Sequence, residues 1–220
     1  MKHLPFNPPI TLNDDEILKE SASFYQWMEA RRSLRFFSSR PIERQVIENL
    51  IMTASTAPSG ANKQPWTFCA VSSPIIKKRI REAAEEEEYR SYNGRMSQEW
   101  LEDLAPFGTD WQKPFLEIAP WVIVIFRRGY ELEKNGHKHP NYYVNESVGL
   151  ACGVLLTAIH QLGLVALTHT PSPMDFLTKI LKRPVNEKPF LLIPVGFPAE
   201  EATVPNIIRK SKEEVLIWFE

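Results

Sequence analysis

The spacing of apolar side chains divides the chain into helical and extended segments. Apolar positions recur every three or four residues across 16–30, after Pro41 and across 74–96, which predicts three amphipathic helices. Residues 142–163 are apolar almost all round a helix, and such a helix is buried in a core or at a subunit interface. A short helix is predicted over 174–184.

Four apolar runs are typical of strands, and they cover 66–73, 120–128, 164–171 and 189–199. The run at 120–128 is continuous and rich in β-branched residues, which predicts a central buried strand. Residues 131–141 predict a polar loop, and the tail 203–220 ends in an apolar, strand-like piece. Strands that alternate with helices predict a layered domain that contains both.

The first residues differ in character from the rest of the chain. Residues 1–15 are rich in proline, which has no backbone N–H to donate, so they predict an extended arm. Residues 16–220 show no repeat and no linker, and we expect them to form a single domain.

Composition and charge narrow the class of protein. The formal net charge of −1 gives no overall field that would attract nucleic acid or an anionic membrane. The longest apolar run has about half the length that a bilayer requires. Cys69 and Cys152 lie in apolar runs without a CxxC partner, as buried thiols in a reducing compartment do. These features predict a soluble, cytoplasmic protein.

Several common catalytic motifs are missing from the sequence. There is no GxGxxG, GxxxxGK[ST], HExxH or GxSxG pattern, so hydrolase and metalloenzyme functions gain little support. His137 and His139 belong to a polar segment that is better explained by solvation than by metal binding. His160 lies on the apolar helix and is interpreted as a core histidine.

The segment RRSLRFF gathers positive charge at one point of a nearly neutral chain. Arg31, Arg32 and Arg35 offer planar guanidinium donors and Ser33 offers a hydroxyl, a set that suits a phosphate group. A cationic turn that complements the dipole at the end of a helix is an equally good explanation. The residues of this segment alone leave both interpretations open.

Further segments shift the balance when they are taken together and in order. Six segments follow RRSLRFF in this order: APSGANKQPWTF, EEEEYRSYNGRM, DWQKPFLEIAP, NESVGLACGVLL, LVALTHTP and LLIPVGFPAEEATVP. With them, the chain from about Phe24 to about Val215 resembles the nitroreductase-fold flavoproteins. Within them it is most similar to the iodotyrosine deiodinases. The resemblance implies an α+β fold of three layers (α/β/α), with a mixed, mainly antiparallel sheet and an intertwined homodimer that binds FMN at its subunit interface.

The resemblance also implies which residues hold the cofactor. Arg31, Arg32 and Arg209 would grip the FMN phosphate, and Ser33 and Arg35 would complete the site. Pro58, Ser59 and Gly60 would line the flavin from the partner subunit. Thr168, His169 and Thr170 would run beside the isoalloxazine, with the Thr170 hydroxyl bonded to N5, a contact that favours electron transfer in single steps. His169 replaces a hydroxyl residue of the vertebrate sequences, and we expect it to act through its backbone.

The same resemblance assigns substrate contacts to four residues. Glu88 would bind the ammonium group of a halotyrosine, Tyr92 and Lys113 its carboxylate, and the Ala61 amide its phenolate oxygen. Glu88 and Tyr92 are four residues apart and share a helix face. Residues 85–115 would form a lid, and repulsion within the acidic run 85–88 would keep that lid unstable until substrate binds.

Two enzymatic functions follow from this resemblance. The first is FMN-dependent reductive dehalogenation of 3-halotyrosines, with an NAD(P)H-linked reductant outside this chain. The second is broad nitroaromatic or quinone reduction by hydride transfer on the same fold, which needs no zwitterion clamp. A non-enzymatic flavin-binding sensor gains no support, because no output segment is visible. The anchor that precedes the vertebrate catalytic domain is not seen in this sequence, which again predicts a soluble form.

Overall fold

The computed structural model describes residues 3–220 and divides the chain into two compact units, Met1–Arg32 and Ser33–Glu220. The first unit holds one helix, α1 (Asp14–Glu29), which follows an irregular segment. The prediction that this helix starts at Glu16 is late by two residues. Asn13 caps it, because its side chain accepts a hydrogen bond from the Glu16 N–H at 3.0 Å while the Glu16 carboxylate accepts one from the Asn13 N–H at 2.9 Å.

A four-stranded sheet organises the second unit, with strands in the order β1-β2-β6-β5 and every neighbouring pair antiparallel. Its strands are β1 (Trp66–Val71), β2 (Trp121–Arg128), β5 (Val165–Ala166) and β6 (Glu187–Gly196). A parallel bridge between Ser33 and Ala166 extends the β5 edge, so the sheet is mixed and mainly antiparallel, as predicted. Residues 122–126 of β2 are fully buried, which confirms the predicted central strand.

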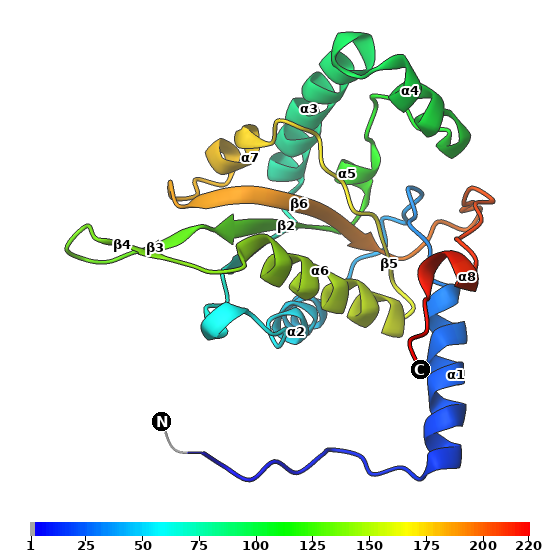
Figure 1. The fold of residues 1–220 in the computed structure, drawn as a ribbon. Helices are drawn as coiled ribbons and strands as arrows, with labels where there is room; N and C mark the ends of the chain where they lie inside the picture. The colour runs from blue at the N-terminus through cyan, green and yellow to red at the C-terminus, as the bar shows by residue number, and fades with distance from the viewer. Residues whose placement is uncertain (1–2) are drawn as a thin grey trace. The chain divides into compact units, whose positions relative to one another are not determined.

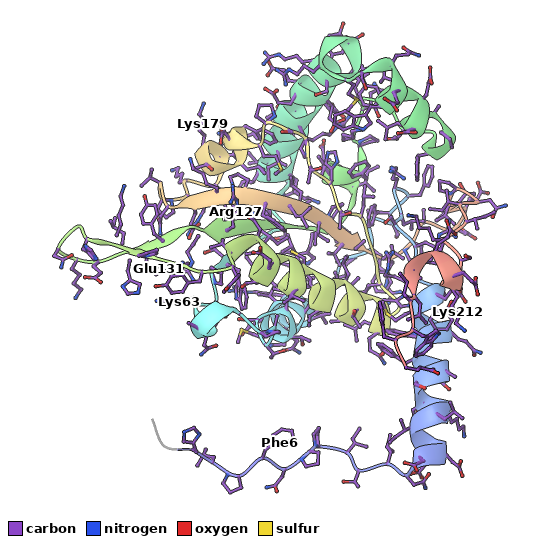
Figure 2. All side chains as sticks on the ribbon, viewed as in Figure 1. Phe6, Lys63, Arg127, Glu131, Lys179 and Lys212 are labelled. Carbon is purple, nitrogen blue, oxygen red and sulfur yellow. The ribbon has the colours of Figure 1, made fainter. Side chains whose placement is uncertain are left out.

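Helices cover both faces of this sheet and complete three layers, as Figure 1 shows. One face carries α2 (Arg44–Ala54) and α6 (Val144–Gln161), which share a core cluster around Leu50, Leu155 and Ile193. The other face carries α3 (Pro74–Arg90), α5 (Phe115–Ile118) and α7 (Asp175–Ile180), around Ile80 and Leu192. In Figure 2, Lys63 lies on the α2 side of the sheet and Lys179 on the α7 side.

The remaining short elements connect these layers. They are η1 (Gly60–Asn62), η2 (Ser91–Arg95), α4 (Gln98–Leu104), η3 (Ala105–Phe107), β3 (Tyr130–Leu132), β4 (Lys138–Pro140) and α8 (Lys212–Val215). None of the helices in residues 3–220 is both long enough and apolar enough to cross a bilayer.

Three local predictions differ from the structure. The segment 131–141 is a β-hairpin (β3–β4) rather than a loop, because residues 133–136 form a turn in which the Gly136 N–H donates to the Glu133 carbonyl oxygen at 2.9 Å and Gly136 has φ +83°. The C-terminal tail contains the short helix α8 in place of a strand, and Ser211 and Glu214 cap that helix. The predicted third strand is reduced to Val165–Ala166 and a bridge at His169.

Candidate active site

A cavity of about 440 Å³ lies on the α3 face of the sheet, between α3, α4 and the segment 167–173. It brings together Arg35, Glu88, Tyr92, Lys113 and Thr168–Thr170, seven of the residues that the sequence assigned to cofactor or substrate. Its remaining wall is largely apolar and includes Met96, Trp100, Leu104, Phe115 and Leu167, none of which was singled out in the sequence. We call Glu88, Tyr92 and Lys113 the lid half-site.

A buried ion pair forms the centre of the lid half-site. Lys113 Nζ lies 3.4 Å from Glu88 Oε2, and only 3% of Lys113 and 8% of Glu88 are exposed. Burial raises the pKa of the Glu88 carboxyl and lowers the pKa of the Lys113 ammonium, while their mutual attraction opposes both shifts. Lys113 Nζ also donates to the carbonyl oxygen of Asp110 and lies 5.4 Å from the centre of the Tyr92 ring.

Glu85 fixes the segment that carries Lys113 onto α3. Its Oε1 accepts a hydrogen bond from the Lys113 N–H at 2.7 Å and one from Arg81 Nε at 2.8 Å. Burial raises the pKa of the Tyr92 phenol, which donates to the Thr109 carbonyl oxygen at 3.3 Å. Glu85 was not singled out in the sequence, although its four-residue spacing from Arg81 on a helix is a visible signal.

Positive side chains neutralise the acidic run 85–88 within the chain itself. The prediction that repulsion among its carboxylates destabilises the lid until substrate arrives is therefore wrong in its premise. Besides Glu88, whose partner is Lys113, three glutamates of the run form ion pairs: Glu85 with Arg81, Glu86 with Arg90, and Glu87 with Arg90 and Arg95.

The segment 167–171 forms the floor of the cavity. The Leu34 N–H donates to the Ala166 carbonyl oxygen at 3.1 Å, and this contact lays Ser33 and Arg35 beside the segment. Thr168 and Thr170 are exposed whereas Leu167 and Pro171 are buried, so the hydroxyls of the two threonines belong to accessible residues. Two hydroxyls and the half-buried Arg35 form a donor set that fits the polar edge of a flat, heteroaromatic cofactor.

His169 is held by β6 through its backbone. Its N–H donates to the Leu192 carbonyl oxygen and its carbonyl oxygen accepts from the Leu192 N–H, at 2.9 Å each, and its expected contribution through backbone contacts stays a prediction. The imidazole lines the cavity and packs edge-on against Phe115, with 5.5 Å between ring centres. Burial, reinforced by the charges of Lys113 and Arg35, lowers the pKa of His169 to about 3, so the ring is neutral at pH 7.

Residues 58–61 lie elsewhere in the chain, and we call them the loop half-site. They follow α2 and lie on the α2/α6 face of the sheet, whereas the lid half-site lies on the α3 face (Figure 1). The Gly60 N–H donates to Ser147 Oγ of α6 at 3.4 Å, and the Gln64 N–H donates to Ser59 Oγ at 2.9 Å. One chain therefore does not bring the two half-sites into one cavity.

The backbone of this loop is strained. Ala61, Asn62 and Gln64 have φ values of 49°, 54° and 46°, a left-handed region that costs energy for residues with a side chain. Among the described residues, the Ala61 N–H has no hydrogen-bond acceptor. Residues with such strained backbones cluster at ligand contacts, and the N–H of the exposed Ala61 is open to solvent or to a ligand.

The three arginines assigned to phosphate are spread over the chain. Arg31 and Arg32 follow α1 in the first unit and are half-buried, whereas Arg209 lies in the exposed segment before α8 in the second unit. Their joint grip on a phosphate stays a prediction.

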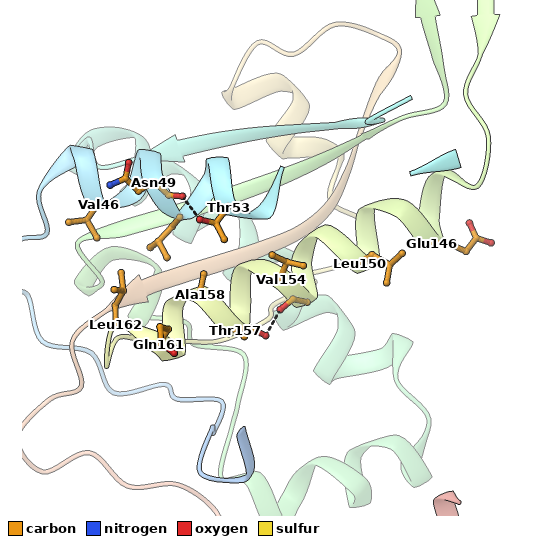
Figure 3. A pocket seen from close by; sticks show the side chains of 13 residues that line it. Val46, Asn49, Thr53, Glu146, Leu150, Val154, Thr157, Ala158, Gln161 and Leu162 are labelled. Atoms are coloured by element: carbon orange, nitrogen blue, oxygen red, sulfur yellow. Dashed lines mark hydrogen bonds between the residues drawn. The ribbon is translucent and has the colours of Figure 1, made fainter. Parts of the chain in front are cut away.

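A second cavity, of about 1100 Å³, runs along α2 and α6 on the opposite face of the sheet. Figure 3 shows Val46, Leu150, Val154, Ala158 and Leu162 along it. Gly149 and Gly153 also line it. The opposite side of α6, with Val148, Leu155 and Ile159, packs into the core, so this helix is buried on one side and open on the other.

The fold and the cavity define an α+β protein of a known family. Residues 28–197 match the model of the nitroreductase family, and the chain belongs to that family. It is 66% identical to an iodotyrosine deiodinase from Haliscomenobacter hydrossis over 93% of this chain and 92% of the relative. It is 42% identical to human iodotyrosine deiodinase 1 over 99% of this chain and 75% of the relative.

Solved structures agree with these relationships. The crystal structure of an oxidized iodotyrosine deiodinase bound to FMN and 3-iodo-L-tyrosine superposes with a TM-score of 0.75 at 28% identity, covering 89% of this chain and 98% of that one. A nitroreductase with bound FMN from Bacteroides fragilis superposes with a TM-score of 0.66 at 16% identity, covering 89% and 98%. The second likeness concerns the fold alone.

Proposed function

We propose that this chain is an FMN-dependent oxidoreductase that removes the halogen of 3-halotyrosines and yields tyrosine and halide. The buried Glu88–Lys113 pair carries this proposal, because two buried, opposite charges that face one cavity match the two charges of an amino acid. The 66% identity to an iodotyrosine deiodinase and the likeness to a structure bound to 3-iodo-L-tyrosine support it.

When the substrate binds, the ion pair between Glu88 and Lys113 is replaced by two ion pairs between these residues and the substrate. Its ammonium group takes the carboxylate of Glu88, and its carboxylate takes the ammonium group of Lys113 and the phenol of Tyr92. Because each charge in the cavity keeps a partner of opposite sign, the exchange avoids the large cost of leaving a buried charge alone. A phenol without these charges cannot separate Glu88 from Lys113 in this way.

The Ala61 N–H binds the phenolate oxygen at the other end of the substrate. Its lack of an acceptor within the described residues leaves it available for that contact. An amide donor favours the anion over the neutral phenol. A halogen on the ring lowers the pKa of the phenol, so a halotyrosine is ionised at neutral pH to a greater extent than its product tyrosine.

FMN, when bound and reduced, would supply the two electrons in single steps; with these electrons and one proton, the ring carbon loses halide and gains hydrogen. The residues that would hold the phosphate end of the cofactor are Arg31, Arg32, Ser33, Arg35 and Arg209. Thr168, His169 and Thr170 would border its ring system, with the Thr170 hydroxyl bonded to N5. The exposed position of Thr170 at the floor of the cavity is consistent with this role.

The complete site belongs to a homodimer, in which one chain contributes the lid half-site and its partner the loop half-site, including Pro58, Ser59 and Gly60. The apolar groove along α2 and α6 supports this assembly, because Gly149 and Gly153 allow another helix to approach closely. Ile217, Trp218 and Phe219 at the C-terminus are 77%, 68% and 94% exposed, which suits an arm that wraps a second copy.

The dimer has a direct test. Analytical ultracentrifugation is expected to give twice the chain mass of 25.4 kDa. Leu150→Glu, which introduces a charge into the groove, should give a monomer that loses FMN. A wild-type monomer that retains FMN would contradict the shared site.

The proposal extends to cellular context. Cys69 and Cys152 are both unpaired, and burial raises the pKa of each thiol, to about 12 for Cys152. Such inert thiols suit a reducing compartment, and we place the protein in the cytoplasm with an NAD(P)H-linked reductant.

The activity itself is tested with the FMN-loaded protein after reduction by dithionite. Mixing with 3-iodotyrosine should reoxidise the flavin and release tyrosine and iodide in equal amounts. Brisk reduction of a nitroaromatic compound without tyrosine formation would instead assign hydride-transfer chemistry. Thr170→Ala should lower the ratio of dehalogenation to nitro reduction, and an unchanged ratio would contradict the role of Thr170.

A further inference from the structure

The proposed function places His169 beside the flavin but gives no role to its Nε2 atom. Its Nε2 atom is buried and has no hydrogen-bond partner within the described residues, although burying an unpaired polar atom destabilises a protein. Nε2 lies 3.9 Å from Glu88 Oε1, which is just beyond hydrogen-bond range. Its side chain is only 11% exposed, so bulk solvent does not compensate for the missing partner.

The two oxygens of Glu88 face different neighbours. Oε2 faces Lys113 at 3.4 Å, and Oε1 faces the imidazole of His169 at 3.9 Å. We propose that His169 is a positioning residue for substrate recognition, whose Nε2–H holds the Glu88 carboxylate in place once Lys113 has turned to the carboxylate of the amino acid. This inference rests on the proposed function and names the residue that determines its preference for a substrate with an ammonium group.

The geometry gives the reason for such a residue. When Lys113 leaves Glu88, the buried carboxylate keeps only the substrate's ammonium, and a neutral donor at Oε1 restores a second hydrogen bond to the anion. A shift of the Glu88 carboxylate by about 1 Å brings its Oε1 within hydrogen-bond distance of His169 Nε2. The bridge between His169 and Leu192 and the contact with Phe115 fix the backbone and the ring, so the donor is presented without ordering a flexible side chain.

The test compares two ligands and three substitutions at one position. The ligands are 3-iodotyrosine and its analogue 2-iodophenol, which lacks both the ammonium and the carboxylate group and therefore leaves Lys113 paired with Glu88. His169→Phe keeps the ring packing and removes the donor. His169→Gln places an amide donor near the Nε2 position, and His169→Asn places one near the Nδ1 position.

Isothermal titration calorimetry on the FMN-loaded proteins measures both affinities. His169→Phe and His169→Asn are expected to weaken 3-iodotyrosine about 10- to 100-fold and to leave the analogue within about threefold. His169→Gln is expected to retain most of the affinity. His139→Phe is the matched control, because His139 also lies 3.9 Å from a glutamate, Glu133, but both side chains are half exposed.

The outcomes separate this inference from the proposed function. Equal losses for both ligands, or no loss in His169→Phe, overturn the positioning role while the halotyrosine function stands. No binding of 3-iodotyrosine by the wild-type holoprotein overturns the proposed function and the inference with it.

Discussion

The two half-sites of the proposed active site would recognise a halotyrosine by opposite means. The lid half-site uses charged side chains, Glu88 and Lys113, which are buried and paired with one another at 3.4 Å. The loop half-site uses a backbone amide, at Ala61, in a loop that is exposed and held in left-handed conformations. The first pairs its charges internally when no ligand is present, whereas the second leaves its donor without an acceptor.

This difference indicates which part of a halotyrosine each half-site would bind. Side-chain charges distinguish an amino acid from a neutral phenol, because a separated ion pair needs two new partners. An amide distinguishes a phenolate from a phenol, because its single donor stabilises the anion. On the proposed function, amino-acid selectivity and halogen selectivity belong to different regions of the molecule and should respond separately to substitution.

The largest effect is expected from a substitution that removes one charge of the lid half-site. Lys113→Ala leaves Glu88 buried without its cation and should weaken 3-iodotyrosine by about 2–5 kcal/mol. Reduction of nitroaromatics, which carry no zwitterion, should remain within a few-fold of wild type. Calorimetry measures the affinity for 3-iodotyrosine, and a nitro-reduction assay measures the rate of nitroaromatic reduction.

Lys78→Ala is the control for that substitution. Lys78 pairs with Glu82 at 3.8 Å, but the two side chains are 63% and 62% exposed, so the loss should be small. Equal effects of Lys113→Ala on both substrates would contradict the assignment of Lys113 to the zwitterion.

A smaller effect is expected at the loop half-site. A Cβ atom at Gly60 would lie 2.8 Å from Tyr143 Cδ2 and 3.0 Å from the Tyr142 carbonyl oxygen, so Gly60→Ala must displace the loop. We expect a loss of about 1–3 kcal/mol in kcat/KM for dehalogenation.

The comparison predicts that Gly60→Ala affects the analogue without an ammonium group as strongly as 3-iodotyrosine itself. Gly129→Ala serves as control, because no atom lies within 4 Å of the added Cβ. Selective loss for 3-iodotyrosine alone would show that the two regions do not divide recognition in this way.

The last effect concerns pH and stability. The folded pKa of His169 is lowered to about 3 from 6.5, so the neutral ring contributes stability that is fully present above pH 6.5 and is lost as pH falls towards 3. The loss is expected to reach about 1.4 kcal/mol per pH unit within that window.

Urea unfolding of the holoprotein at pH 7 and pH 5 measures this loss, and His169→Phe should reduce it. Glu88, Lys113 and Arg35 face the same cavity and remain in both proteins, so the difference isolates His169. Identical pH dependence of the two proteins would contradict a buried, neutral imidazole.

Much of the fold could be predicted from the sequence because its periodicities are strong. The run at 120–128 is buried on both faces and is the central strand β2. The hairpin at 131–141 was missed because its polar residues mask the turn at 133–136, and only the Asn135-Gly136 dipeptide carries the signal. The short strand β5 could not be predicted in length, because pairing with β6 rather than composition ends it.

The candidate site was predicted residue by residue through a resemblance, and the structure adds what spacing cannot provide. Glu88 and Lys113 are 25 positions apart, and only the fold shows that they form a pair. His169 was expected to act through its backbone, since a single substituted residue in a motif does not reveal where its ring points. Burial against Phe115 and β6 decides that direction.

The central claim is that each site combines the lid half-site of one chain with the loop half-site of its partner. Coexpression of Lys113→Ala chains with Gly60→Ala chains tests it most directly, because each mixed dimer then holds one site with both half-sites intact. We predict that 3-iodotyrosine dehalogenation returns to about a quarter of the wild-type rate, since half of randomly paired dimers are mixed. Activity no higher than the mean of the two separate variants would contradict the shared site.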